Sequence, residues 1–309
     1  MAIPAALQPG LKLPVIAAPM FLVSGPELVI AACKSGVIGT FPALNQRTTE
    51  GYSEWLDQIK AALGPDDARY GVNLIVHPTN SRLMADVQVT VQHQVPLVIT
   101  SLGAVKDLVD AVHSYGGLVF HDVTTLRHAQ KAAEAGVDGL ILVCAGAGGH
   151  AGVRSPFALV DEVRQFFTGT IILSGCISTG RDIATAMMLG ADFAYLGTRF
   201  INTTESMAPD AYKQMILESH AADITYTPAI SGVPANFMTK SLIANGLDPK
   251  NLPEAKAMSL EHEARAWKDV WSAGQGVGSV KDVLPTAELV ARLGREFDEA
   301  KSDFEKRFG

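Results

Sequence analysis

The chain has 309 residues, of which 48% are hydrophobic and 18% are charged, and its formal net charge is -7. This balance excludes an intrinsically disordered chain, which combines low hydrophobicity with a high net charge. The sequence contains no long Lys/Arg run, which argues against a nucleic-acid partner because polyanion binding rests on clustered cations.

The three cysteines, Cys33, Cys144 and Cys176, stand far apart and form no Cys-x-x-Cys pair. We therefore expect free thiols in a reducing, cytoplasmic compartment. No set of acidic residues has the spacing of metal ligands, so no metal is predicted. The apolar run at 13–23 is short, contains two prolines and lacks a basic flank, so it predicts a buried strand and no membrane span.

Short β-branched apolar runs alternate with segments of helical period between residues 15 and 197. These runs are 15–19, 37–41, 71–75, 97–101, 118–122, 139–143, 170–174 and 193–197. The clearest helices are predicted at 125–135 and 179–189, each followed by a glycine suited to a left-handed C-cap. Eight such units predict an α/β fold, a closed (β/α)8 TIM barrel. A doubly wound sheet would need fewer strands and a dinucleotide fingerprint near its start.

The pattern changes after residue 200, where helices are predicted at 210–220, 254–272 and 286–307. We expect one domain with two parts, a barrel core over residues 1–200 and a helical C-terminal extension over residues 201–309. The additional helices would cap the barrel mouth or pack in a homodimer.

A glycine-rich loop over residues 144–152 follows the sixth predicted strand. Its glycines would let a flat ring approach the backbone, and His150 beside them is the best catalytic candidate. The alternative is a solvated histidine in a glycine-rich turn. The loop also matches a dinucleotide-binding turn, but Pro156 delays the next helix and no acidic residue ends the next strand.

Two further loops follow the seventh and eighth predicted strands, where TIM barrels commonly bind phosphate. Backbone N–H groups near Gly175 and Gly197, with the hydroxyls of Ser174 and Thr198, would donate to a phosphate dianion. The structural alternative for the glycines is tight packing. Arg199 would either add charge to this cradle or pair with a structural carboxylate.

Together these residues resemble the nitronate monooxygenase family, formerly called 2-nitropropane dioxygenases, over nearly the whole chain. The segments that carry the resemblance are 17–20, 71–74, 147–150, 174–175, 196–200 and 271–275. The resemblance implies an FMN-dependent oxidoreductase that uses O2 to convert alkyl nitronates into a carbonyl compound and nitrite, without a metal. His150 would accept a proton from a nitroalkane or donate to the nitro oxygens.

The resemblance also implies which residues bind the cofactor and the substrate. The expected cofactor-binding residues are Pro19, Met20, Phe21, Asn73, Gly148, Gly149, Ser174, Gly175, Cys176, Gly197 and Thr198. Met20 would lie beside the flavin ring and Asn73 would hydrogen-bond its polar edge, although a core methionine and a strand amide are the structural alternatives. Phe237, Ser272 and Gln275 are expected in the substrate pocket or in a lid.

One departure concerns Asp122, because some relatives have lysine at this position. A carboxylate there would disfavour an anionic reduced flavin unless it points away or pairs with Arg127 or His128. The same loops also resemble FMN-dependent enoyl-acyl-carrier-protein reductases and NAD(P)H:quinone reductases. A non-catalytic, phosphate-binding barrel is a further alternative.

Overall fold

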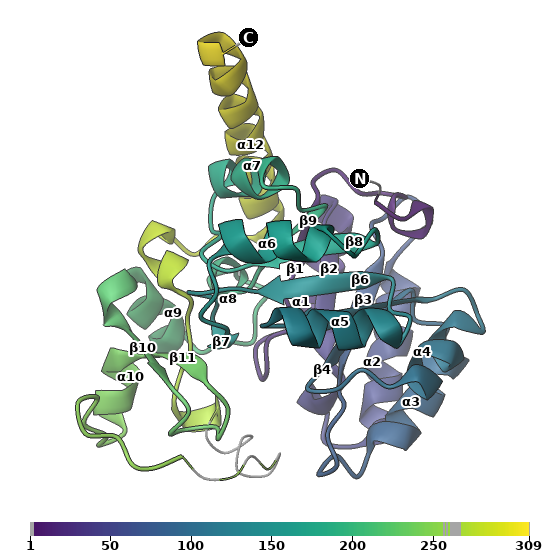
Figure 1. Ribbon diagram of the computed structural model, residues 1–309, viewed down its shortest axis with the longest axis horizontal. Helices are drawn as coiled ribbons and strands as arrows, with labels where there is room; N and C mark the ends of the chain where they lie inside the picture. The colour runs from purple at the N-terminus through teal and green to yellow at the C-terminus, as the bar shows by residue number, and fades with distance from the viewer. Residues whose placement is uncertain (1–2, 256, 258, 260–266, 309) are drawn as a thin grey trace.

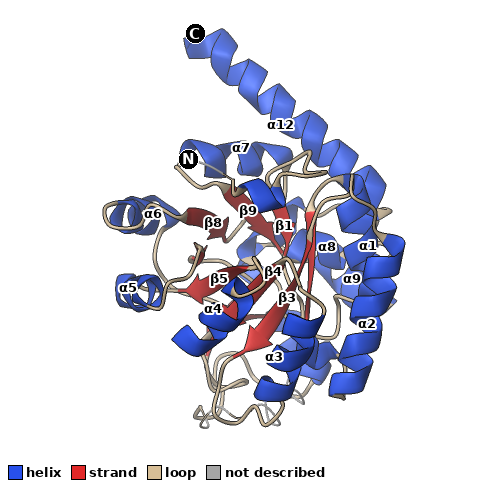
Figure 2. Ribbon diagram, turned by 90° about the vertical axis from the view of Figure 1, so that its right-hand side faces the viewer, coloured by secondary structure: helices blue, strands red, loops and turns tan. Residues whose placement is uncertain are grey.

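The computed structural model describes residues 3–255, 257, 259 and 267–308, and its centre is a closed barrel of parallel strands (Figure 2). In barrel order the strands are β1 (Val15–Ala17), β2 (Ile38–Pro42), β3 (Tyr70–Ile75), β4 (Leu97–Ser101), β5 (Leu118–Val123), β6 (Gly139–Val143), β8 (Thr170–Ser174) and β9 (Phe193–Leu196). Parallel pairing of β1 with β9 closes the barrel. The predicted (β/α)8 barrel is therefore confirmed.

Helices surround the barrel, as expected where right-handed crossovers join parallel strands. They are α1 (Pro26–Ser35), α2 (Thr49–Ala62), α3 (Leu83–Gln92), α4 (Lys106–His113), α5 (Leu126–Glu134), α6 (Pro156–Arg164), α7 (Gly180–Met188) and the short α8 (Thr198–Ile201). The side chains of Thr48, Thr125 and Thr179 cap α2, α5 and α7 by accepting backbone N–H groups. Short 3-10 turns lie at Ala5–Leu7 and Ala43–Asn45.

The strands are buried on both faces, which explains why their sequences read as continuous apolar runs. Residues facing the barrel interior, among them Ile16, Phe120 and Ile172, form one apolar cluster. The alternate residues, such as Val15 and Val119, pack in a larger cluster against the helices. Packing on both faces holds the strands in place, so their carboxyl ends offer a rigid support for a site.

The C-terminal part forms a smaller lobe beside the barrel, at the left of Figure 1. It contains α9 (Asp210–Leu217), β10 (Ile224–Thr227), β11 (Ala235–Met238) and α10 (Thr239–Ala244), with 3-10 turns at Ala221–Asp223 and Gln275–Ser279. The antiparallel strands β10 and β11 pair with β7 (Gly149–His150), which comes from the glycine-rich loop. This hairpin was not expected, since the extension was predicted to be helical.

The last helix, α12 (Thr286–Phe308), packs against α7 and α1 and extends beyond the barrel (Figure 1). It lies on the outer wall, so it does not cover the mouth. Of the helix predicted at 254–272, positions 256, 258 and 260–266 lie outside the described residues, and 267–269 are helical. No helix in the described part of the chain has the length and apolar character needed to cross a membrane.

Candidate active site

A cavity of about 1460 Å³ opens at the carboxyl ends of the barrel strands. The predicted site residues that line it are Pro19, Met20, Phe21, Asn73, Gly148, Gly149, His150, Ser174, Gly175, Cys176, Gly197, Thr198 and Ser272. Phe237 and Gln275 are not among its lining residues. The fold therefore brings most of the predicted residues to one concave site.

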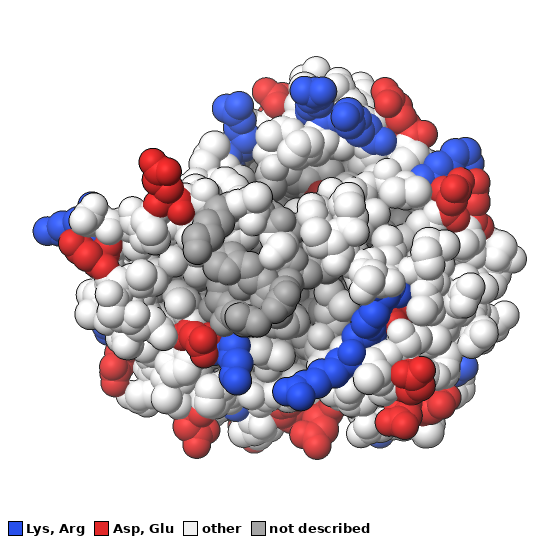
Figure 3. Space-filling model, turned by 90° about the horizontal axis from the view of Figure 1, so that it is seen from below, with Lys and Arg blue, Asp and Glu red and all other residues white. Residues whose placement is uncertain are grey.

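On the face drawn in Figure 3, acidic and basic side chains are interspersed, without a large area of one sign.

One corner of the cavity is built by the loops that follow β8 and β9. Gly175 and Cys176 both adopt positive φ, +130° and +57°, which turns the chain sharply at the end of β8. Within the described part of the chain, the N–H groups of Cys176 and Gly197 make no backbone hydrogen bond. Such amides, beside the first turn of α8, form a concave donor set for an anion.

Arg199 does not contribute to this corner. Its side chain is 3% exposed and donates to the Asp282 carboxylate at 2.6 Å and to the Asp282 carbonyl at 3.3 Å. Asp282 is also bound by Arg292 at 2.6 Å. Of the two alternatives for Arg199, the structure shows pairing with a carboxylate.

The tail segment around residue 272 is hydrogen-bonded to the glycine-rich loop. The Ser272 hydroxyl accepts from the Gly149 N–H at 2.7 Å and donates to the Asn236 carbonyl at 2.6 Å. The Gln275 N–H donates to the Gly146 carbonyl at 2.8 Å. The tail segment therefore returns to the barrel mouth, with Ser272 on the cavity wall and the exposed Gln275 off it.

His150 ends the short strand β7 and pairs with Ala235 of β11. Its half-buried ring meets the edge of Trp267, with ring centroids 5.6 Å apart. Trp267 in turn stacks on Phe237 at 4.8 Å, and Phe237 is fully buried. Phe237 therefore lies behind the cavity wall, where it supports the Trp267 ring that contacts His150. Sequence spacing gave no sign of this arrangement, because the contacts depend on the unexpected hairpin.

A chain of hydrogen bonds crosses the barrel mouth from β3 to β5. The Asn73 amide donates to the Ser101 hydroxyl at 2.7 Å, and that hydroxyl donates to the Asp122 carboxylate at 2.5 Å. Burial raises the pKa of Asp122 to about 6, while the Ser101 hydrogen bond and the charge of His150 act in the opposite direction. Asp122 lines the cavity, and among the described residues it makes no ion pair with Arg127 or His128. Ser101 was not expected, although its place at a strand end was a usable signal.

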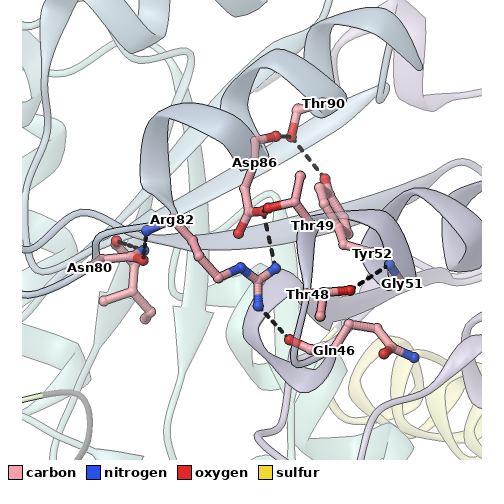
Figure 4. Close-up of polar contacts among 10 residues, drawn as sticks. Gln46, Thr48, Thr49, Gly51, Tyr52, Asn80, Arg82, Asp86 and Thr90 are labelled. Atoms are coloured by element: carbon pink, nitrogen blue, oxygen red, sulfur yellow. Dashed lines mark hydrogen bonds and ion pairs between the residues drawn. The ribbon is translucent and has the colours of Figure 1, made fainter.

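A second polar group on the wall, also not expected from the sequence, is the guanidinium of Arg82 (Figure 4). It donates to the Gln46 carbonyl at 2.6 Å and to the Asp86 carboxylate at 3.0 Å. Asp86 is 1% exposed and also accepts from the Thr49 hydroxyl at 2.7 Å. This cation is held by the half-buried Gln46 and the buried Asp86 on the β2 and β3 side of the barrel, away from the loops after β8 and β9.

A parallel barrel whose cavity is lined by the loops after its last two strands and by a histidine has the layout of a barrel enzyme. Residues 67–296 match the family model described as nitronate monooxygenase. The nitronate monooxygenase of Paraburkholderia phytofirmans is 27% identical, with 94% of each chain covered. The chain belongs to the nitronate monooxygenase family, and it is a flavin-dependent oxidoreductase.

Solved structures give the same fold. A nitroalkane oxidase from Streptomyces ansochromogenes aligns with a TM-score of 0.84 at 24% identity, covering 97% of this chain and all of the other. FabK from Thermotoga maritima aligns with a TM-score of 0.81 at 22% identity, covering 98% and 97%. At these identities the likeness describes the barrel and its added lobe, so the chemistry must be argued from the site.

Proposed function

We propose that this protein is an FMN-dependent nitronate monooxygenase that oxidises small alkyl nitronates with O2 to a carbonyl compound and nitrite. The observation that carries the proposal is that an anion corner and His150 line one cavity. The three free cysteines fit a reducing compartment, so we propose that the enzyme acts in the cytoplasm.

The corner after β8 and β9 fits the phosphate of FMN. Its donors would be the N–H groups of Gly175, Cys176 and Gly197 with the hydroxyls of Ser174 and Thr198, as in other phosphate sites made of backbone dipoles. When bound, FMN supplies the electron transfer with the substrate and O2, which no side chain can perform.

The glycine-rich loop and the β1 end fit the flat ring. Gly148 is packed so closely that a Cβ there would lie 2.8 Å from the Gly274 nitrogen, whereas a Cβ on Gly149 would meet no atom within 4 Å. Gly148 therefore accommodates the tail, and the open backbone at Gly149 is where a flat ring would approach. Pro19, Met20 and Asn73 line the same space, Met20 as an apolar surface and Asn73 as a directional polar group.

His150 would act on the substrate itself. A protonated imidazole donates to the nitro oxygens of a nitronate, and a neutral one accepts a proton from a neutral nitroalkane. The contact with Trp267 fixes one edge of the ring, which reduces the orientations available to it. Met20 and Phe21 would keep water from the reacting carbon, so that polar contacts count for more.

The test begins with the visible spectrum and anaerobic mixing of the purified yellow protein. Bleaching by propionate 3-nitronate or a short alkyl nitronate, with no bleaching by NADH, supports the monooxygenase. Bleaching by NADH alone would assign a reductase, and a colourless protein that takes up no FMN would reject both. In steady state, nitrite should appear in step with oxygen consumed, and oxygen uptake that yields only peroxide would contradict the proposal.

The variant His150→Asn should retain FMN and lose turnover by about 10²-fold or more, the usual scale for a lost general acid or base. His113→Asn, at an exposed position of α4 that does not line the cavity, is the matched control and should keep the wild-type rate. Equal rates for the wild type and His150→Asn at every pH would remove His150 from the reaction.

A further inference from the structure

Asp122 is an ionisable group of the cavity wall to which the proposed function gives no task. Its Oδ2 atom accepts the Ser101 hydroxyl. Its Oδ1 atom is buried, and in the described part of the chain it has no hydrogen-bond partner. A buried carboxylate oxygen without a donor is unfavourable, so this atom requires either a proton of its own or a donor from a ligand.

The surroundings of Asp122 favour a proton. On β4 its neighbour is the neutral Ser101, and the adjacent β6 residues, Ile141 and Val143, are apolar. Tyr195 of β9 is a further titratable neighbour. Burial raises the pKa of Tyr195, and the charge of Asp122 raises it further. His150 on β7 is the described basic group whose charge acts on Asp122.

The other titratable group nearby is His121, on the same strand. Its Nδ1 atom bonds to the Thr100 hydroxyl at 2.7 Å. Burial, followed by the charge of His128, lowers the pKa of His121 to about 4, so it is neutral near pH 7. It therefore adds no positive charge to stabilise an ionised Asp122.

An anionic substrate makes the protonation state of Asp122 decisive. An ionised Oδ1 would repel a nitronate in the same cavity, whereas a protonated Oδ1 would present an O–H donor to it. We propose that Asp122 couples anion binding to proton uptake: its carboxyl takes up one proton as the anion enters, donates that O–H to an anion oxygen, and releases the proton when the anion leaves. The inference rests on the proposed function, because it concerns the anionic substrate of that site.

The test uses the FMN-loaded enzyme and nitrate, a planar anion isoelectronic with the simplest nitronate and inert toward the flavin. Calorimetric titrations at pH 7.5, in two buffers of different ionisation enthalpy, count the protons taken up per nitrate bound. We expect nearly one proton for the wild type. Above the pKa of the carboxyl, the nitrate Kd should rise about tenfold per pH unit, because the protonated fraction falls by that factor.

Two variants of this group separate the proposal from a structural role. Asp122→Asn is close in shape and permanently neutral, so uptake should fall to near zero and nitrate affinity should lose its pH dependence. Ser101→Ala removes the hydroxyl that stabilises the ionised carboxylate, so the pH dependence of nitrate binding should move to higher pH. Unchanged proton uptake in Asp122→Asn, with a native flavin spectrum, would overturn the proposal.

His150→Asn identifies the proton acceptor and should retain the uptake. If uptake disappears in His150→Asn and persists in Asp122→Asn, the proton goes to the imidazole and the proposal is wrong. Failure of the wild type to bind nitrate would also overturn it. The proposed function is judged separately, by nitrite release. If the protein oxidises nitronates but binds nitrate without proton uptake, the proposed function stands and this inference is wrong. If it binds nitrate with proton uptake but releases no nitrite from nitronates, only the proposed function is wrong.

Discussion

The Gly274 N–H donates a hydrogen bond to the Thr198 hydroxyl at 2.9 Å, joining the C-terminal tail to the first residue of α8. The hydroxyl accepts this bond and keeps its own hydrogen for another acceptor in the cavity. Tail and anion corner are thus linked through one side chain, so a change that displaces the tail should also weaken cofactor binding.

Gly148→Ala should produce that displacement. Its Cβ would lie 2.8 Å from the Gly274 nitrogen and 3.1 Å from the Ala273 carbonyl carbon, both backbone atoms that cannot rotate away. Overpacking of this kind costs roughly 1–3 kcal/mol, which corresponds to a loss of roughly 5- to 150-fold in FMN affinity if it falls on the bound state. Fluorescence titration of the apoprotein with FMN measures the change.

The matched control for this substitution is Gly294→Ala. Gly294 lies within α12, and a Cβ there would meet no atom within 4 Å. Alanine in a helix interior is favoured over glycine by about 0.5–1 kcal/mol. This variant should therefore be slightly more stable and bind FMN normally, and equal FMN affinity in both variants would disprove the packing argument.

Ser272→Ala should loosen the tail without a clash. It removes the acceptor of the Gly149 N–H and the donor to the Asn236 carbonyl. Leaving partly buried partners unsatisfied costs about 1–3 kcal/mol, which thermal unfolding of the apoprotein should record as a lower Tm. Ser279→Ala, at an exposed position of the same segment, should leave Tm unchanged. A Tm loss of the same size in both would mean that the Ser272 bonds contribute nothing specific.

The strands and the sharp turn after β8 could be predicted because their signals are local. A run such as 139–143 is apolar throughout because both faces of its strand are buried, and Gly175 stands where the backbone must adopt positive φ. The three-stranded sheet of β10, β11 and β7 could not be predicted in the same way, because β7 comes from a loop that is distant in the sequence. For that reason the buried place of Phe237 was not foreseen.

Side-chain networks were also beyond prediction from one sequence. Arg82 and Asp86 suggest an ordinary helical ion pair by spacing, and only the folded chain brings the Gln46 carbonyl to the same guanidinium (Figure 4). Arg199 had two equal interpretations because its partner, Asp282, is 83 residues away. Long-range partners of this kind have no periodic signature in the sequence.

The Arg199–Asp282 pair should be important for stability. Asp282→Ala would leave the Arg199 guanidinium, 3% exposed, without its carboxylate. Because Asp282 is itself 31% exposed, the cost should lie near the lower end of the roughly 3–5 kcal/mol that breaking a buried pair requires. Arg292→Ala removes the more exposed partner of the same carboxylate and should cost at most about 1 kcal/mol. Urea unfolding of the two variants compares these costs, and similar losses would show that the buried contact is not the important one.

His121 and Asp122 should have opposite effects on stability between about pH 4 and 6. Burial lowers the pKa of His121 to about 4, so the unfolded chain binds the proton more tightly and stability rises with pH up to the ordinary histidine pKa. Burial raises the pKa of Asp122 to about 6, so the folded state binds the proton more tightly and stability falls as pH rises through the same range. Each slope is at most about 1.4 kcal/mol per pH unit, and in the wild type the two should largely cancel.

His121→Asn should therefore make the unfolding free energy fall with pH relative to the wild type, Asp122→Asn should make it rise, and the double variant should restore the wild-type profile. Denaturant unfolding at half-unit intervals from pH 4 to 6.5 measures all four proteins, and parallel profiles for the wild type and both single variants would show that neither side chain titrates as its burial requires.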